Sequence, residues 1–523
     1  MAFLYYLTIA TAGFVGFVLL LVKKWRMRCS HPKIDGMLVA PEPSGALPFI
    51  GHLHLLGNKV PLAKTLAAMA DKYGSIFLIR LGMYPSLVVS NHEAVRECFT
   101  VNDKALGSRL TSSQGLYLGY NYASFGFASY GPLWRNMRKL AMFKILSARR
   151  LETLKHHYIS EIDAFIGELF LFRKNNGPIK VVISEWFEKL SLNMITKTVA
   201  GKRYFNNFHD EGDTIAQKFG KVIREFMYLS GEFVASDFIP FLGWFNLQGQ
   251  VLKSMKQISK DLDSLFGCWV EEHRLKQQKN ESNEEQDFID VMLAEIEDDF
   301  AFGFSRDTLI KATILNIILA GADTTSINLT WILSLLLNNR DALKHAQQEL
   351  DVHVGRDRWV QSSDMKDLVY LQAIVKETLR LYPPGPLLVP HAATEDCTVC
   401  GYHLPKGTRL FVNAWKLHRD PRVWSEPDKF TPERFLTRHV GVDASGQHHE
   451  FVPFGSGRRA CPGYSFATQV THLTLARLLQ GFEIDTPLSE TVDLTEGVGM
   501  TMPKKTPLDI VLTPRLSCEL YNV

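Results

Sequence analysis

The strongest chemical signal in this 523-residue chain is a glycine-rich loop that holds a cysteine and leads directly into a helix. The loop spans Phe454 to Gly463, with Cys461 near its end. A thiolate that ligates haem iron needs backbone N–H donors to hold its charge, and a tight turn at Gly457 would supply them. Gly463 would let the following helix approach a flat ring closely, and Arg459 would neutralise a carboxylate of that ring.

Spacing alone leaves two other interpretations of this loop open. Cys461 would also fit as a buried core cysteine. Gly455, Gly457 and Ala460 match a loose dinucleotide-binding fingerprint, but no long strand precedes them, which argues strongly against a nucleotide site.

An acid and an alcohol interrupt the long aliphatic run from Ser305 to Asn338, which apolar spacing predicts to be one helix. Gly321 would let a flat ligand and dioxygen lie against this helix. Asp323 would bring protons from water, and Thr324 would hydrogen-bond the oxygen. The alternative is a helix kink satisfied by an internal hydrogen bond from a Ser or Thr side chain.

Two further pairs have the spacing of one helical turn. Glu377 and Arg380 share a helix face, and Arg434 would complete an ion network with them, although such a pair is usually a solvated surface pair. Trp134 and Arg138 would present an indole edge and a guanidinium to one carboxylate.

The elements that must position these groups are mostly helical. A β-hairpin is predicted from Ile76–Leu81 and Leu87–Ser90, around Gly82 and Pro85. Apolar spacing predicts helices at Trp134–Leu146, Trp186–Ala200, Lys253–Arg274, Ser305–Asn338, Tyr370–Leu381 and Tyr464–Gln480.

No linker is long enough to divide the body, so we expect one large, mainly α domain with minor β-sheet. The polar stretch from His273 to Asp287 is the best candidate for a mobile surface loop.

Composition excludes two broad classes of protein. With 46% hydrophobic and 22% charged residues, the chain is too apolar for a disordered scaffold. A formal charge of +3 is too weak to imply a nucleic-acid groove. The seven cysteines are an odd number and widely scattered, which indicates a reducing compartment.

The N-terminal segment predicts a membrane anchor. Residues 2–22 form an uncharged, mostly apolar run, about 31 Å long as a helix, which matches a bilayer core of roughly 30 Å. Basic residues follow the run, which favours a retained anchor with the remainder cytosolic. Residues 23–48 are expected to be a basic stop-transfer segment and proline-rich hinge, and 49–523 the catalytic domain.

In this order, the motifs closely resemble the cytochrome P450 superfamily of haem-thiolate monooxygenases, over essentially the whole chain. The anchor, hinge and loops look like the plant microsomal type. The segments LGYNYA from Leu118, AGKRYF from Ala200 and YPPGPLLVPH from Tyr382 are similar to plant family 82. One departure is Leu110 after Ser108-Arg109, where plant relatives usually carry proline. It bears on the loop over the substrate, not on the haem.

The resemblance implies roles for individual residues. Cys461 would be the axial ligand of haem b, Asp323 and Thr324 would activate oxygen, and Glu377, Arg380 and Arg434 would lock the core. The residues that it implies around the haem are Trp134, Arg138, His391, Phe454, Gly457, Arg459, Cys461 and Gly463. The substrate pocket would include Asn316, Ala320, Leu387, Leu388, Val389 and Met500.

The resemblance also implies a reaction: insertion of one atom of O2 into a small hydrophobic plant metabolite, such as an alkaloid, terpenoid or phenolic. No nicotinamide or flavin fingerprint is present, so electrons from NADPH would come through a membrane-bound cytochrome P450 reductase. A basic cluster suits an acidic partner, although a solvated helix face explains it nearly as well: Arg135, Arg138, Lys139, Lys144, Arg149 and Arg150.

The expected location is the endoplasmic reticulum membrane, with a single pass and a cytosolic catalytic domain. A reductase-independent haem-thiolate isomerase or dehydratase, and a non-enzymatic haem-binding membrane protein, remain alternatives. Cys397 and Cys400 have redox or zinc spacing, but no second pair follows, so we expect structural thiols.

Overall fold

The computed structural model describes residue 16 and residues 37–57, 60–176, 180–208, 214–245, 249–279, 286–297 and 302–521. The expected anchor at 2–22 and most of the hinge at 23–48 lie outside these residues, except for residue 16 and the end of the hinge. In the described part of the chain, no helix combines the length and apolarity that crossing a bilayer requires.

All six helices expected from apolar spacing are present, with ends that shift by a few residues. They are α4 (Pro132–Leu140), α7 (Ile183–Ala200), α9 (Gly249–Gln278), α11 (Arg306–Asn338), α13 (Val369–Leu381) and α15 (Tyr464–Gly481). The expected helix from Trp134 to Leu146 changes character at Ala141, where α4 gives way to a π-helical turn that ends at Ile145.

Further helices were not predicted from the spacing. They are α2 (Leu62–Tyr73), α3 (His92–Phe99), α5 (Ala148–Thr153), α6 (Lys155–Asn176), α8 (Thr214–Gly231), α10 (Phe288–Glu295), α12 (Arg340–His353) and α14 (Ala414–Leu417). The longest of these, α6, packs against α7, α15 and strand β10 (Asp509–Pro514). Because it has neighbours on several sides, its apolar residues do not form the single stripe that sequence reasoning looks for.

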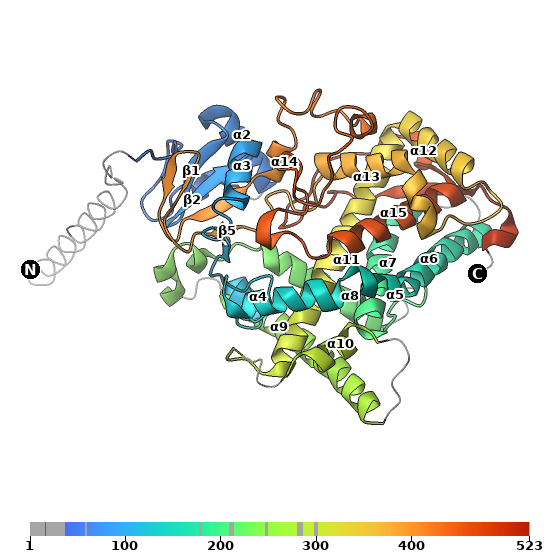
Figure 1. The fold of residues 1–523 in the computed structure, drawn as a ribbon, viewed down its shortest axis with the longest axis horizontal. Helices are drawn as coiled ribbons and strands as arrows, with labels where there is room; N and C mark the ends of the chain where they lie inside the picture. Colours follow the sequence, from blue (N-terminus) through green and yellow to red (C-terminus); the bar gives the residue numbers. More distant parts are fainter. Residues whose placement is uncertain are drawn as a thin grey trace, which may run out of the picture.

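The largest sheet lies beside the helical body (Figure 1) and has the strand order β1-β2-β8-β5-β3. Its strands are β1 (Ile76–Leu81), β2 (Tyr84–Val89), β3 (Ser108–Arg109), β5 (His391–Ala392) and β8 (Arg409–Val412). The expected second strand, Leu87–Ser90, therefore begins three residues earlier and ends one residue earlier. The β3–β5 pairing sets Arg109 directly opposite His391, which matters for the site below.

Two small sheets complete the β-structure. One has the order β4-β10-β9, with β4 at Val181–Val182 and β9 at Phe482–Asp485. The other is the hairpin of β6 (Cys397–Val399) and β7 (Tyr402–Leu404). Cys397 and Cys400 both pack against a hydrophobic core beside the sheet, which is consistent with structural thiols.

Helix α11 runs through the middle of the molecule (Figure 1) and packs against α7, α9, α13 and α15. The Ser305 hydroxyl caps it by accepting from the Thr308 N–H. Most of its side chains are buried in the main hydrophobic core. This placement makes α11 the element against which any internal site must be built.

The prediction of a mobile loop from His273 to Asp287 is wrong at both ends. Helix α9 continues to Gln278, and both His273 and Asp287 are buried. Their side chains join α9 to the start of α10, so the polar sequence reflects a buried polar contact. Residues 280–285 lie outside the described part of the chain.

Candidate functional site

The cysteine loop is a tight turn that closes on itself before α15. The Cys461 N–H donates to the Phe454 carbonyl at 2.8 Å. Gly457 has φ +66°, and a Cβ there would come within 2.5 Å of Asp103 Oδ1, so the turn requires glycine. Arg458 fixes the loop from outside, because its Nε donates to Asp103 Oδ2 at 2.8 Å.

The surroundings of Cys461 provide what a thiolate needs. Burial raises the pKa of its thiol, as a low-dielectric site must. The backbone N–H groups of Gly463 and Tyr464 and the positive charge of Arg138 act in the opposite direction and lower this pKa. Because Tyr464 is the first residue of α15, these donors belong to a helix N-terminus, which favours an anion.

Arg459 lies in a pocket of carbonyl groups. It donates to the carbonyls of Gly107 at 2.7 Å, Ala128 at 2.7 Å and Phe125 at 3.2 Å. Its guanidinium lies over the Trp134 ring, 4.3 Å from the centroid. Burial, together with the nearby positive charges of Arg109 and Arg138, lowers the pKa of Arg459 to about 8.

Arg109 is a site residue that the sequence analysis missed. Its Nη1 donates to the carbonyls of Val389 at 2.7 Å and Pro390 at 3.1 Å, and burial lowers its pKa to about 9. Its strand partner His391 is buried, with Nδ1 bonded to the Leu106 carbonyl at 2.8 Å. Burial and the charge of Arg109 hold the pKa of His391 well below its usual range.

These cationic groups fit a bound dianion. Within the described residues, no carboxylate pairs with Arg109, Arg138 or Arg459, although holding partly buried positive charge without a counter-ion is costly. The two propionates of haem would supply the missing negative charge, and the Cys461 thiolate would supply the iron ligand. The residues present therefore fit haem.

The middle of α11 has an accessible face inside an otherwise buried helix. Between Leu309 and Leu337, the residues that are not buried are Lys311, Asn316, Ala320, Gly321, Asp323 and Thr324. Asn316, Ala320, Asp323 and Thr324 follow helical spacing, so they lie along one face. We call these four residues the α11 face. Because Ala320 is exposed although α11 packs against α7, α9, α13 and α15, this face borders open space between the helices.

The side chains of Asp323 and Thr324 differ in their hydrogen bonding. Burial raises the pKa of the Asp323 carboxyl to about 6, and its Oδ2 atom has no hydrogen-bond partner. The Thr324 hydroxyl donates to the Ala320 carbonyl, which is the internal bond that the alternative interpretation expected. The arrangement leaves an acid with one buried, unpartnered oxygen and an ordinary helix alcohol beside it.

Gly321 does not serve the purpose proposed from the sequence. A Cβ at this position would come within 2.9 Å of Ile195 Cδ1 on α7. The glycine therefore permits close packing of α7 against α11, and its missing side chain points at that helix and not at a flat ligand.

The polar side-chain atoms of Asn316 already form hydrogen bonds within the chain. Its Oδ1 accepts from the Gly126 N–H at 3.2 Å, and its Nδ2 donates to the Ser124 hydroxyl and to the Ala312 carbonyl. It joins α11 to the loop that follows β3, which was expected to cover the substrate.

The remaining pocket candidates divide into two groups. Leu388 packs against the core that contains Cys397 and Cys400, and Leu387 packs against a core on the other side of the sheet. Val389 and Met500 are 46% and 40% exposed. They therefore have more side-chain surface available to a ligand than the two leucines.

The ion network is buried. Glu377 is 0% exposed and receives bidentate hydrogen bonds from Arg380 at 2.8 and 2.9 Å. Arg434 Nε and the Thr431 N–H donate to the same carboxylate at 3.0 and 2.9 Å. Both guanidinium groups also donate to backbone carbonyls, including that of Lys429. Glu377 thus joins α13 to the segment before the cysteine loop.

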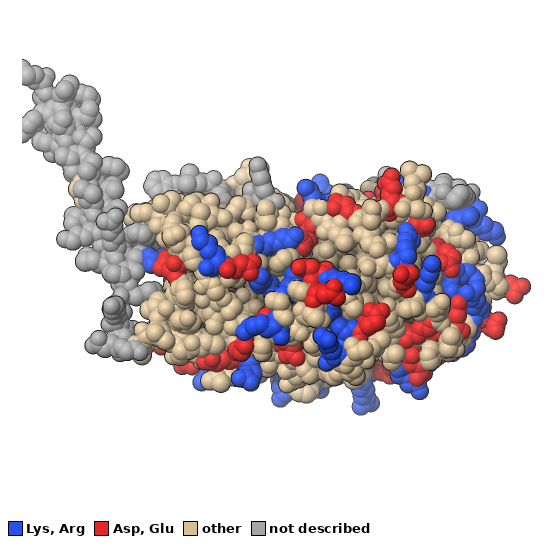
Figure 2. Space-filling view, turned by 90° about the horizontal axis from the view of Figure 1, so that it is seen from above, with Lys and Arg blue, Asp and Glu red and all other residues tan. Residues whose placement is uncertain are grey.

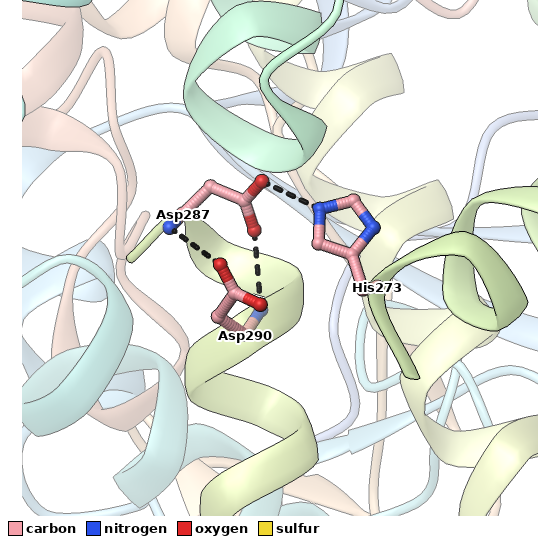
Figure 3. Close-up of side chains that lie close together, drawn as sticks. All are labelled: His273, Asp287 and Asp290. Atoms are coloured by element: carbon pink, nitrogen blue, oxygen red, sulfur yellow. Dashed lines mark hydrogen bonds and ion pairs between the residues drawn. The ribbon is translucent and has the colours of Figure 1, made fainter. Parts of the chain in front are cut away.

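A second cluster of titratable groups lies away from this site (Figure 3). Asp287 Oδ2 and His273 Nε2 are 2.7 Å apart, and Asp287 Oδ1 caps α10 by accepting from the N–H groups of Ile289 and Asp290. His273 Nδ1 is bonded to the Trp269 carbonyl. Although these carboxylates and this imidazole are close enough to bind a metal ion, their atoms already bond one another and backbone groups of α9 and α10, so the cluster is a structural joint.

Comparison with known proteins agrees with the geometry. Residues 41–509 match the family model described as Cytochrome P450. The chain is 56% identical to Cytochrome P450 CYP82J17 of Trigonella foenum-graecum, covering 96% of this chain and 97% of that protein. It is 50% identical to vinorine hydroxylase of Rauvolfia serpentina, with 98% of both chains covered.

It is also 50% identical to xanthotoxin 5-hydroxylase CYP82C4 of Arabidopsis thaliana, over 92% of this chain and 94% of that protein. Among solved structures, a zebra fish cytochrome P450 with progesterone matches with a TM-score of 0.73 and 27% identity, covering 87% of this chain and 100% of that one. The cysteine loop, the unpaired arginines near it and these matches lead to one conclusion: the chain belongs to the cytochrome P450 family of haem-thiolate enzymes, in plant family 82.

Proposed function

We propose that this protein inserts one oxygen atom from O2 into a hydrophobic plant specialised metabolite, using electrons from NADPH that a separate reductase delivers. The observation that carries the proposal is the α11 face, which places an acid and an alcohol side by side in a helix that packs against the helix after the cysteine loop. A titratable acid with a hydroxyl beside it can relay protons, which the activation of oxygen would require.

Haem held by Cys461 would supply oxygen activation, with thiolate donation favouring cleavage of the O–O bond. The chain would hold haem through the iron and through the propionates. The N–H groups of Gly463 and Tyr464 would stabilise the thiolate that binds the iron, and the positive charges of Arg459 and Arg109 would balance the propionates. Trp134, stacked under Arg459, keeps that guanidinium in place.

Asp323 would hold and pass on protons. With a pKa of about 6, its carboxyl can exchange protons near neutral pH, which an ordinary aspartate with a pKa near 4 does poorly. The Thr324 hydroxyl can rotate from the Ala320 carbonyl toward the internal space, so it would donate there when needed.

The substrate is proposed to be a compact hydrophobic alkaloid, terpenoid or phenolic. Three relatives are named for vinorine, nicotine and xanthotoxin, which are small molecules. The accessible pocket candidates Ala320, Val389 and Met500 are apolar. The amide group of Asn316 is already hydrogen-bonded to Gly126 and Ala312. Such a surface favours an apolar skeleton over a charged one.

The reductase is proposed to bind near α4 and α5. Arg135, Lys139 and Arg149 are exposed there, and their positive charges would attract an acidic electron-donor protein. Lys144, in the same cluster, already pairs with Glu295 at 2.8 Å, so it contributes less.

We further propose attachment to the endoplasmic reticulum membrane through residues 2–22, with a cytosolic body. The end of the molecule that carries β1 and β2 shows mostly uncharged side chains (Figure 2). Exposed apolar residues of the N-terminal segment, the β1–β2 turn and the segment after α8 are Met37, Leu38, Val39, Leu47, Met83, Phe233 and Trp244. We call this set the apolar end; such a surface suits contact with lipid.

The test is turnover in microsomes that contain the full-length protein and a plant cytochrome P450 reductase. Mixtures of alkaloids, terpenoids and phenolics would be incubated with NADPH under ¹⁸O2, with Cys461→Ala as the matched control. We expect substrate-dependent NADPH consumption and one ¹⁸O atom in the product or in a released aldehyde. Conversion of an organic hydroperoxide without reductase, and none with NADPH, would contradict the proposal and favour an isomerase or dehydratase.

A further inference from the structure

We propose that Asn316 of α11 is a positioning residue for Arg109 and Arg459, two of the arginines that would balance the haem propionates. It acts through the turn of residues 124–128, which we call the bridging turn. Asn316 holds this turn on one side, and the turn offers backbone carbonyls to both arginines on the other. The contact therefore joins the α11 face to the groups that would hold haem.

The amide of Asn316 has one orientation that suits its neighbours. Its Oδ1 accepts from the Gly126 N–H at 3.2 Å, and its Nδ2 donates to the Ala312 carbonyl at 2.8 Å and to the Ser124 hydroxyl. Turning the amide over would set Nδ2 against the Gly126 N–H and Oδ1 against the Ala312 carbonyl. Since α11 packs against α7, α9, α13 and α15, the bond to Ala312 ties the amide to a firmly held helix.

The contact requires glycine at position 126. A Cβ on Gly126 would come within 2.5 Å of Asn316 Oδ1. The amide of Asn316 would have to move away from such a side chain and give up its bond to the Gly126 N–H. A substitution at Gly126 can therefore break the contact from the side of the turn, with Asn316 itself unchanged.

The bridging turn is closed by its own hydrogen bonds. The Ser124 carbonyl accepts from the N–H groups of Phe127 and Ala128, each at 2.9 Å. Ser124, Phe125 and Ala128 are buried, and the last two belong to the main hydrophobic core. Because the turn is closed and packed, a displacement of Ser124 or Gly126 also moves the carbonyls of Phe125 and Ala128.

One peptide plane links Asn316 to Arg459. The Gly126 N–H, which donates to Asn316, and the Phe125 carbonyl, which accepts from Arg459 at 3.2 Å, belong to the same peptide unit. This unit is planar, so a rotation of its N–H rotates its carbonyl as well. The two hydrogen bonds also strengthen each other, because each polarises the shared peptide.

The same turn reaches Arg109. The Nε of Arg109 donates to the Gly126 carbonyl at 3.3 Å, and Arg459 donates to the Ala128 carbonyl at 2.7 Å. The remaining acceptors of the two guanidinium groups are the carbonyls of Gly107, Val389 and Pro390. Carbonyls carry only partial charge, so the guanidinium groups keep their positive charge for a dianion, and their place depends on where these carbonyls lie.

The consequence is an effect of Asn316 on the reduction potential of the haem iron. Reduction adds an electron, so positive charge near the haem favours the ferrous state. Without the bond from Asn316, the bridging turn shifts and the two guanidinium groups move from where they neutralise the propionates. The ferrous state then becomes less favourable. A purely structural role of Asn316 would change stability and leave the potential of the haem-loaded protein unchanged.

The experiment measures the ferric–ferrous midpoint potential of the full-length haem-loaded protein without substrate. Asn316→Leu removes the hydrogen-bonding atoms at similar volume, and Gly126→Ala displaces the amide. We expect both to have a more negative potential, with a ferrous/ferric ratio at fixed applied potential about two- to tenfold lower, the range of one ordinary hydrogen bond. The double variant should shift no further, because both substitutions break the same bond.

The matched control is Gly267→Ala in α9, because nothing lies within 4 Å of a Cβ at that position. It should keep the wild-type potential. Gly126→Ala leaves the residues of the α11 face unchanged, so agreement between Gly126→Ala and Asn316→Leu excludes an effect of the altered pocket surface alone. If Asn316→Leu does not take up haem, Ser124→Ala, which removes only the hydroxyl that accepts from Asn316 Nδ2, must shift the potential in the same direction.

A second readout tests the contact itself. Amide hydrogen exchange over residues 124–128 should become faster in Asn316→Leu and in Gly126→Ala, because the Gly126 N–H loses its acceptor. Unchanged exchange, an unchanged potential, or additive shifts in the double variant would overturn the proposal. Since no substrate or reductase is present, these results do not depend on the proposed oxidation of a plant metabolite, which the turnover experiment decides separately.

Discussion

Glu377 carries more structural weight than its sequence spacing indicates. It is fully buried, and two guanidinium groups and one backbone N–H bind its carboxylate. Removing the charge would leave Arg380 and Arg434 buried without a counter-ion, which is far more costly than losing a surface pair.

We therefore expect Glu377→Gln to reduce the free energy of unfolding by about 3 kcal/mol or more, as measured by denaturant unfolding. Glu490→Gln, at an exposed position, is the control and should change it little. If both variants unfold alike, the buried network does not stabilise the fold.

Val389 provides the residue-scale test of the pocket. Val389 is more exposed than Leu387 and Leu388, so an added ring there would take up space in the proposed substrate pocket. Val389→Phe should change the product ratio or exclude the substrate, while the carbon monoxide spectrum stays normal. The same product ratio and turnover as the wild type would place Val389 outside the pocket.

At the scale of elements, α9 and α10 are joined by His273 and Asp287. The carboxylate of Asp287 raises the pKa of His273 above its ordinary value, against the effect of burial. The stabilisation from this contact is therefore complete below the unfolded pKa of about 6.5 and is lost as pH rises through the folded pKa.

We expect hydrogen exchange in α10 to speed up from pH 6 to pH 8.5 beyond the ordinary chemical dependence. His273→Gln should remove this extra pH dependence, because glutamine does not titrate. Exchange that depends on pH equally in both proteins would show that the joint is not controlled by His273.

The helices and strands also show how much of the structure could be predicted from the sequence. Helix α11 was predicted to within one residue, because a long aliphatic run covers nearly its whole length. The role of Gly321 was missed because Ile195 meets it from another helix. Arg109 was missed because only the β3–β5 pairing brings it to His391, and such long-range pairing leaves no local signal.

On the scale of the whole molecule, the apolar end and the cationic α4–α5 region give the protein two distinct surfaces. A protein that lacks residues 2–22 should still bind lipid vesicles weakly through the apolar end. Trp244, which is 87% exposed, should contribute strongly to that binding because aromatic rings favour the lipid interface.

The comparison is between Trp244→Ser and Leu488→Ser in the truncated protein, measured by vesicle sedimentation. Leu488 is 90% exposed but follows β9, which belongs to the small sheet with β4 and β10 and not to the sheet of β1 and β2. Only Trp244→Ser should reduce binding. An equal effect of both substitutions would mean that the apolar end does not contact lipid.

The central claim is that Cys461 binds haem as a thiolate, in a loop whose N–H donors and neighbouring arginines are already arranged for it. The most direct measurement is the reduced, carbon monoxide difference spectrum of the full-length protein in microsomes, compared with Cys461→Ala and with Cys268→Ala, which removes an exposed cysteine elsewhere. The account predicts the red-shifted thiolate band in the wild type and in Cys268→Ala, and its loss in Cys461→Ala. A band of wild-type intensity in Cys461→Ala would contradict it.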